Sequence, residues 1–253
     1  MSKKKKQKII MKQIIGVSLI FLFLLTFWGS IKWANYQHAF DVNNIRISGY
    51  KIVEEIDYQK IVNEFNIQTI QSADLKKISL KIERHPFVKA ARISRHYPNQ
   101  LRINIVERIP LAILNLESIL MIDNEGFILP DQGYSQGALI PILSGFNSAK
   151  DLYPEGEKTY SIKVKEAVSI LNKILNGYPE LYKNISELTL NKDDEYVIIL
   201  ADQPTRVILG KDEILTKLNI LKNFDQALGL RKLTDYQFLD MRYKKQLIAK
   251  EWT

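Results

Sequence analysis

The chain has 253 residues and a mass of 29.4 kDa, enough for one large domain or two ordinary ones. With 46% apolar and 25% charged residues, its composition excludes a disordered polymer and a membrane protein with many spans. It contains no cysteine, which excludes disulfides, thiol nucleophiles and cysteine-bound metals.

The net charge of +8 is concentrated at the N-terminus. Seven of the 36 Lys and Arg residues fall within residues 1–32, before the first acidic residue, Asp41, which leaves 29 basic against 28 acidic residues in the remainder. A nearly neutral body lacks the positive charge with which nucleic-acid-binding proteins neutralise phosphates. We therefore expect no nucleic-acid partner and ascribe the basic segment to membrane targeting.

The 19 uncharged residues between Lys12 and Lys32 are enough for a helix to cross a membrane, which takes about 20 mostly apolar residues. We predict a cytoplasmic basic tail over residues 1–12, a transmembrane helix over 13–32 and a linker over 33–39. Lysine-rich flanks stay in the cytoplasm, so the remaining chain is expected on the external, or periplasmic, side. A cleaved signal peptide would have a shorter apolar run and a small-x-small cleavage site. A buried core helix is the second alternative.

Residues 40–109 are predicted to form one small domain. The alternation of apolar and polar side chains from Leu101 to Ile105 is typical of a half-buried strand. Asp74 is a plausible helix N-cap, and Pro86 disfavours helical geometry in the residue before it. The expected elements are a strand closed by the Ser48-Gly49 turn, helices over 54–65 and from Asp74 to before Pro86, and strands over 87–95 and 101–105. Their order is β-α-α-β-β.

Residues 110–253 are predicted to form a second, mostly antiparallel β domain with interspersed helices. It opens with a hairpin around the turn Asp123-Asn124-Glu125. The helix after Ser161 has an apolar stripe of Val164, Val168, Leu171 and Leu175 and ends at Gly177. The other expected elements are strands over 139–143, 186–190, 195–201, 204–209, 236–242 and 246–251, and a helix over 211–228. The fold class is therefore α+β.

The residues that usually carry catalysis or cofactors form no recognisable motif. The eleven glycines produce no dinucleotide-binding or phosphate-binding loop, and the three histidines have no second ligand at metal-binding spacing. The acidic run Asp193-Asp194-Glu195 is better explained as a turn between two strands. We expect no cofactor, no metal and no enzymatic activity, and we expect a membrane-anchored scaffold that binds partners through sheet edges and grooves.

Four segments carry a family resemblance. The stretch Ile45-Arg46-Ile47-Ser48-Gly49-Tyr50, followed by residues 82–112 with His85-Pro86-Phe87-Val88 near their start, resembles the POTRA domain of the FtsQ/DivIB bacterial cell-division proteins. Residues 120–126 resemble the hairpin of that family, and residues 239–246 resemble its last conserved segment. Phe87 stands where the family often has Trp.

The resemblance implies a non-catalytic scaffold of the divisome at the division septum. It would be a single-pass protein of the cytoplasmic (inner) membrane that links early and late division proteins. The implied partners are FtsB/DivIC-like and FtsL-like proteins and other membrane divisome components. A partner strand would add to the edge of the C-terminal β domain.

Residue by residue, the resemblance places partner binding at Arg242, Tyr243, Lys245, Gln246 and Leu247, and at Lys211, which resembles a basic residue that pairs with a partner carboxylate. The residues themselves leave alternatives open. Lysines near an exposed edge also protect it from aggregation. Lys211 has the alternative of being an ordinary solvated residue near a helix start.

Two other classes of function stay open from the residues alone. A membrane-anchored envelope-assembly or secretion factor with one POTRA domain would share the first half of the chain without needing the terminal strand. A membrane-tethered enzyme would need a pocket with titratable groups of perturbed pKa.

Overall fold

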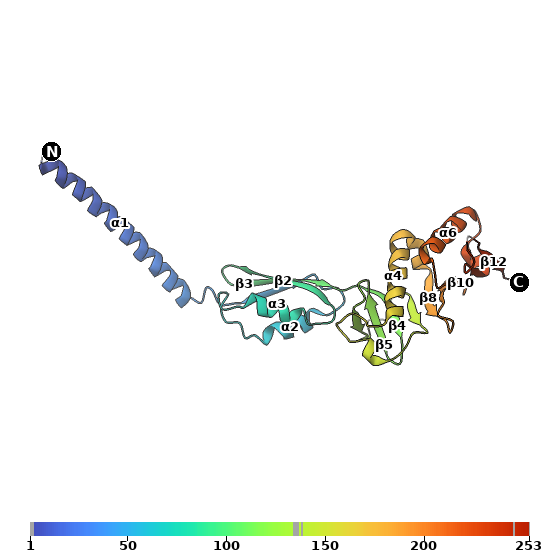
Figure 1. Cartoon of the computed structure of the whole chain (residues 1–253). Helices are drawn as coiled ribbons and strands as arrows, with labels where there is room; N and C mark the ends of the chain where they lie inside the picture. Colours follow the sequence, from blue (N-terminus) through green and yellow to red (C-terminus); the bar gives the residue numbers. More distant parts are fainter. Residues whose placement is uncertain (1–2, 134–136, 138, 245, 253) are drawn as a thin grey trace. The chain divides into compact units, whose positions relative to one another are not determined.

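The computed structural model describes residues 3–133, 137, 139–244 and 246–252 (Figure 1). The chain divides into two compact units. The first contains Met1–Tyr50, Glu54–Ile82 and Ala91–Ile105, and the second contains Lys51–Val53, Glu83–Ala90 and Val106–Thr253. The predicted α+β class is confirmed.

Helix α1 (Lys3–Tyr36) contains the apolar segment expected from the sequence. From Met11 to Tyr36 its mean hydropathy reaches 2.3, and it is long and apolar enough to cross a membrane. Large apolar side chains along it are exposed, for example Phe21 and Leu24. Because exposing such side chains to water is unfavourable, a lipid environment explains the helix better than water does.

The elements that follow α1 have the predicted order β-α-α-β-β. They are β1 (Asn44–Ser48), α2 (Glu55–Asn63), α3 (Leu75–Ile82), β2 (Val88–His96) and β3 (Gln100–Glu107). The sheet has the strand order β1-β3-β2, with β1 parallel to β3. Asp74 caps α3 as expected, because its Oδ1 accepts a hydrogen bond of 3.1 Å from the backbone N–H of Lys77.

The two helices lie on one side of this sheet (Figure 1). Tyr58 of α2 and Ile78 of α3 are buried, as are Leu101 and Ile103 of β3. Gly49, after β1, has a φ of +91°, and a Cβ there would overlap the carbonyl oxygen of Ile105. The turn after β1 therefore requires glycine, for reasons of both backbone conformation and space.

The second unit is built on a nine-stranded sheet with the order β12-β11-β10-β9-β8-β7-β4-β5-β6. The strands are β4 (Pro110–Asn115), β5 (Ile119–Asp123), β6 (Ile128–Pro130), β7 (Ile142–Ser144), β8 (Ile185–Leu190), β9 (Tyr196–Leu200), β10 (Arg206–Gly210), β11 (Tyr236–Asp240) and β12 (Ile248–Glu251). Five of the eight pairings are antiparallel, and β4–β7, β7–β8 and β10–β11 are parallel.

Three helices accompany the sheet: α4 (Ile162–Gly177), α5 (Pro179–Lys183) and α6 (Ile214–Ala227). Short 3-10 turns lie at Lys150–Leu152 and Leu233–Asp235. The side chain of Ser161 caps α4, as expected, by accepting from the N–H of Val164 at 3.3 Å. The core contains Leu171 and Ile174 of α4 together with Leu188, Ile198 and Val207 of the sheet.

Three expectations for this unit were wrong or incomplete. Leu175 is exposed, because the buried stripe of α4 continues from Leu171 through Ile174. The strand expected over 139–143 is shorter and is β7, and Leu139 is fully exposed. Strand β4 was missed because Leu111, Ala112 and Leu114 are all buried, so the strand shows no clear alternation of apolar and polar residues.

Candidate protein-binding edge

The residues expected to bind a partner lie at one end of the nine-stranded sheet. Arg242, Tyr243, Gln246 and Leu247 lie in the connection between β11 and β12, and Lys245 lies outside the described residues. The final strands are shorter than expected: β11 ends at Asp240 instead of residue 242, and β12 begins at Ile248 instead of residue 246.

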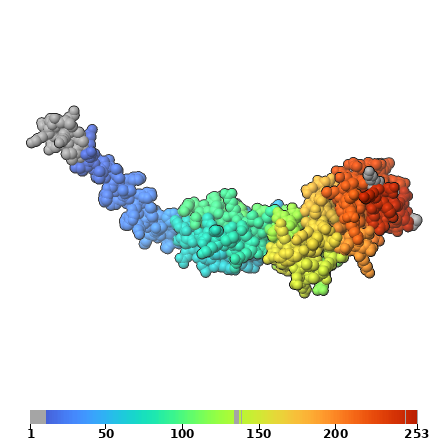
Figure 2. All heavy atoms as spheres, viewed as in Figure 1, coloured from blue at the N-terminus to red at the C-terminus, as the bar shows by residue number. Residues whose placement is uncertain are grey.

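Strand β12 is the edge of the sheet at this end. It pairs in antiparallel fashion with β11, with Ile248 opposite Asp240 and Glu251 opposite Tyr236. All four of its residues are exposed, and no strand of the described chain pairs with its other side. Figure 2 shows the C-terminal residues, in red, at the surface of the second unit. An edge of this kind presents unpaired backbone N–H and C=O groups to another chain.

The opposite edge of the sheet, β6, is covered by a segment of the same chain. The N–H of Ile128 donates to the carbonyl of Glu157 at 2.8 Å, and the N–H of Gly156 donates to the carbonyl of Ile128 at 2.8 Å. Bridges join Ile128 to Glu155 and Phe127 to Lys158. The backbone N–H and C=O of Ile128 on this side are therefore already used within the chain.

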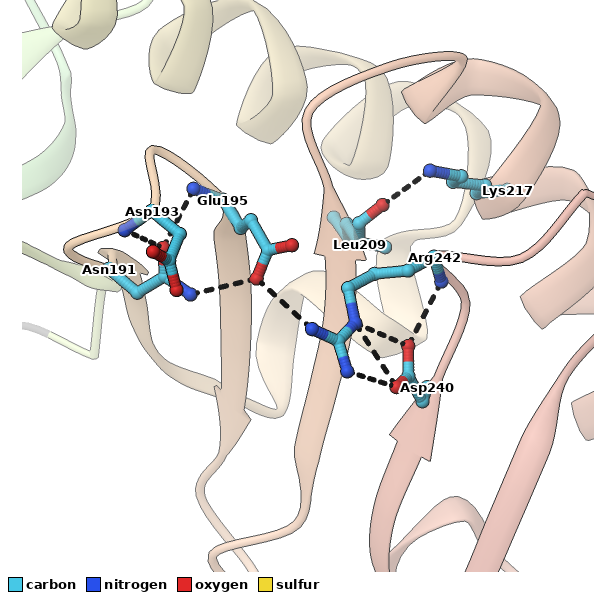
Figure 3. A network of polar contacts seen from close by, with 7 residues as sticks. All are labelled: Asn191, Asp193, Glu195, Leu209, Lys217, Asp240 and Arg242. Atoms are coloured by element: carbon cyan, nitrogen blue, oxygen red, sulfur yellow. Dashed lines mark hydrogen bonds and ion pairs between the residues drawn. The ribbon is translucent and has the colours of Figure 1, made fainter.

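Arg242 is held by carboxylates from two other strands or their ends (Figure 3). Its Nε and Nη2 donate to the carboxylate of Asp240 at 3.0 and 2.6 Å, and its Nη1 lies 3.5 Å from Oε2 of Glu195. The side-chain hydrogen bond from Arg242 is the main cause that lowers the pKa of Asp240 below its ordinary value. These contacts hold the side chain of Arg242 in place at the start of the β11–β12 connection.

The side chain and backbone of Glu195 are both held by hydrogen bonds with Asn191. Asn191 Nδ2 donates to Glu195 Oε2 at 2.9 Å, and Asn191 Oδ1 accepts from the backbone N–H groups of Asp193 and Glu195 at 2.9 and 2.8 Å. The acidic run that sequence analysis interpreted as a turn is thus a turn organised by Asn191, and its last residue reaches the connection before β12.

Lys211 and Arg242 line one groove of about 410 Å³. Its other lining residues are Glu195, Gly210, Asp212, Glu213, Lys217 and Lys244. Lys211 is exposed there, whereas Lys217 is buried and its Nζ donates to the carbonyl of Leu209 at 2.7 Å. The rim of the groove carries both signs of charge, because Lys211 and Lys244 are exposed beside the exposed carboxylates Asp212 and Glu213.

The five expected binding residues that the structure describes differ in their exposure. Leu247 is half-buried and packs against the core of the second unit, so it anchors the start of β12. Tyr243 is 52% exposed. Gln246 and Leu247 were expected to belong to the last strand, but β12 begins one residue after Leu247, and its own exposed residues Ile248 and Lys250 were not among the expected binding residues.

Among the described residues, no three His, Asp or Glu side chains are grouped so that they could hold a metal ion. The fold and this edge define a class of protein: a chain with an apolar N-terminal helix, a small β-α-α-β-β domain and a larger β domain with an open edge.

Comparison with known proteins identifies the family to which such a chain belongs. Residues 40–108 match the family described as POTRA domain, FtsQ-type, and residues 112–242 match the family described as Cell division protein FtsQ/DivIB, C-terminal. The chain belongs to the FtsQ/DivIB family of cell-division proteins. The second match ends at Arg242, before β12 begins.

Several curated relatives are named Cell division protein FtsQ. The protein of Syntrophotalea carbinolica is 28% identical over 209 residues, which cover 82% of this chain and 71% of the relative. That of Rickettsia prowazekii is 26% identical over 203 residues, or 78% of this chain and 72% of the relative. That of Myxococcus fulvus is 20% identical over 229 residues, or 89% and 79%. The chain therefore has a role in bacterial cell division and belongs with membrane-associated division proteins.

Proposed function

We propose that this chain is a non-catalytic scaffold of the divisome that binds FtsB/DivIC-like and FtsL-like partners by β-strand addition along β12. The observation that carries the proposal is the difference between the sheet edges: β6 is covered by residues 155–158, whereas β12 is exposed along its whole length. Strand addition at such an edge gains affinity from backbone hydrogen bonds and selectivity from alternate side chains.

The side chains around the open edge suit an amphipathic partner strand. Tyr243 and Ile248 offer exposed apolar surface, and Lys211, Lys244 and Lys250 offer positive charge. A partner strand that carries carboxylates beside apolar residues would match both. Arg242 contributes by ordering the connection, since its guanidinium already contacts Asp240 and Glu195.

The membrane topology belongs to the same proposal. The lysine-rich N-terminus stays in the cytoplasm, α1 crosses the membrane, and the two domains lie on the external side at the septum. Because the chain has no cysteine, a single introduced cysteine can report on which side of the membrane its position lies. A cysteine in place of Ser2 should resist a membrane-impermeant thiol reagent in intact cells, and one in place of Gln132 should react. The reverse pattern would contradict this topology.

Tyr243→Ala tests the edge directly, with Tyr160→Ala as a matched control. Both side chains are largely exposed, at 52% and 58%, and Tyr160 lies in the segment before α4. Loss of an aromatic anchor typically weakens an interface by about tenfold or more. We expect that loss for Tyr243→Ala alone when the full chain in nanodiscs is titrated with the FtsB-like protein of the same organism. Equal affinity of both variants and the parent chain would contradict strand addition at this edge.

A further inference from the structure

The face of the β1-β3-β2 sheet that lies opposite α2 and α3 carries arginines. Along β3, Leu101, Ile103 and Ile105 are buried toward the helices, so Arg102 points to the other side. The same alternation along β1 buries Ile47 and exposes Arg46.

Arg92 of β2 lies on the same face. Arg95, three residues further on, reaches the helix side, because its Nε and Nη2 donate to the carbonyls of Ile70 and Ala73 at 2.8 and 2.7 Å. Successive side chains of a strand point to opposite faces, so Arg92 is directed away from the helices, and it is exposed. We call Arg46, Arg92 and Arg102 together the arginine face.

Two members of the arginine face are direct neighbours. In the parallel pairing of β1 with β3, Arg46 lies opposite Arg102, and Ser48 lies opposite Asn104. Like charges in directly opposite positions destabilise a sheet. Within the described residues, no carboxylate lies within ion-pair distance of any of the three arginines. The face therefore has a repulsion that an anionic partner would relieve.

The single carboxylate in the three strands is occupied elsewhere. Glu107, at the end of β3, accepts hydrogen bonds from the backbone N–H groups of Lys51, Ile52 and Val53 at 2.6, 2.7 and 3.1 Å. The imbalance extends over the domain: residues 40–108 hold 12 basic against 8 acidic side chains, whereas residues 109–253 hold 17 against 20. Positive charge is thus concentrated in the domain that follows the membrane helix.

The sheet is tied closely to that helix. Helix α1 ends at Tyr36 and β1 starts at Asn44, eight residues later. Eight extended residues span at most about 28 Å, so the first strand stays within that reach of the membrane surface. A short tether raises the effective concentration of the sheet at the membrane, which favours even a weak contact.

We propose that the arginine face binds the anionic phospholipid headgroups of the membrane that α1 spans. The planar guanidinium groups match phosphate oxygens with paired N–H donors, and their positive charges add in a salt-dependent way. Ser48 and Asn104 border the pair and supply further polar contacts, since Ser48 Oγ already donates to Asn104 Oδ1 at 2.7 Å and leaves the amide nitrogen of Asn104 as a donor. Docking would hold the POTRA domain against the lipid surface.

The test uses the full chain in two kinds of nanodisc, one of phosphatidylcholine alone and one with added phosphatidylglycerol. A cysteine in place of Asn104 carries a fluorophore that spin-labelled lipid headgroups quench. A second label site, Leu80→Cys, serves as control, because α3 turns Ile78 and Ile82 to the core and leaves Leu80 exposed. We expect quenching at position 104 only in the anionic discs, with loss at high salt, and little at position 80.

The double variant Arg46→Gln/Arg102→Gln should lower the ratio of docked to free domain by about thirtyfold, or about fivefold for each arginine near an anionic surface. The variant should fold, since it removes a like-charge pair. Lys76→Gln/Lys77→Gln removes the same charge from α3 and should leave quenching unchanged. Equal quenching in both kinds of disc, or equal losses in the two double variants, would overturn the proposal, as would docking that requires an acidic protein partner instead of lipid.

Discussion

The two edges of the nine-stranded sheet differ in what covers them. At β6, residues 155–158 pair with Phe127 and Ile128, and the neighbouring turn is held by Arg108 and Asp123. At β12, every residue is exposed and the connection before it is held by Arg242. A covered edge cannot add a strand, whereas an open one can. In the part of the chain that the structure describes, β12 is therefore the edge that offers unpaired backbone groups along its whole length.

The β6 end of the sheet, here called the closed end, contains a buried ion pair between Arg108 and Asp123. Arg108 Nη1 lies 2.7 Å from Asp123 Oδ2, with side chains that are 9% and 2% exposed, and the guanidinium lies 3.4 Å from the centre of the Phe127 ring. Asp123 Oδ1 also accepts from the N–H groups of Glu125 and Phe127, both at 2.8 Å. One carboxylate thus fixes both the hairpin turn and the arginine.

The largest effect is expected for Asp123→Ala. The variant leaves a buried guanidinium without its main partner and frees two turn N–H groups, so the free energy of unfolding of the second unit should fall by about 3–5 kcal/mol. Chemical denaturation of the full chain measures this. The exposed Asp193→Ala serves as control and should change stability by less than about 0.5 kcal/mol. Similar losses for both would mean that the closed end has no special role in stability.

At the β12 end of the sheet, here called the open end, Arg242→Ala should lower the free energy of unfolding by less, about 1–2 kcal/mol, because the arginine is partly solvated. The folded-state pKa of Asp240 is lowered, chiefly by its hydrogen bonds with Arg242. The pair therefore stabilises the fold above the ordinary carboxyl pKa of about 4, and its contribution is lost as pH falls through the folded-state value.

Denaturation of Arg242→Ala and the parent chain at several pH values sharpens the comparison. The difference in unfolding free energy should be full near neutral pH and should shrink as the pH falls below about 4. A difference in unfolding free energy that stays constant below about pH 4 would show that Arg242 contributes through packing alone.

Gly156→Ala should loosen the cover of β6. Gly156 has a φ of +77°, which costs a residue with a Cβ about 1 kcal/mol, although no atom lies closer than 3.8 Å to the added carbon. Hydrogen exchange at the N–H of Ile128, which donates to Glu157, should become faster, whereas exchange in β9 should not change. Unchanged exchange at Ile128 would mean that the cover does not depend on this turn.

The smallest effect on stability is expected for Ile248→Thr in β12. Threonine retains strand propensity, and the side chain is exposed, so the free energy of unfolding should change by less than about 0.5 kcal/mol. Affinity for the FtsB-like protein should nevertheless fall measurably. If stability fell and affinity did not, Ile248 would belong to the fold rather than to the binding edge.

Local patterns predicted most of the elements. Alternation in Leu101–Ile105, the cap at Ser161 and the turn at Asp123 each depend on neighbours along the chain, and each was confirmed. Strand β4 escaped prediction because both of its faces are buried. The short helix α5, which begins at Pro179, has too few residues for a periodic pattern.

The candidate site was only partly accessible from the sequence. Arg242, Gln246 and Leu247 were expected inside the last two strands and lie in the connection between them instead, and the role of this connection in binding stays a prediction. The contact of Arg242 with Glu195 joins residues 47 positions apart in sequence, and no local pattern indicates it. The burial of Lys217 beside Lys211 was likewise invisible, because both are lysines near a helix start.

By itself, the amino-acid sequence determined the membrane helix, the order of elements and the family, because apolar runs, turn residues and motifs are properties of neighbouring positions. Only the tertiary structure decided which sheet edge stays open, since the cover of β6 comes from residues about thirty positions away. It also placed Arg46 beside Arg102, because the pairing of β1 with β3 brings together residues 56 positions apart. Strand pairing is a long-range choice, made by the packing of the whole domain.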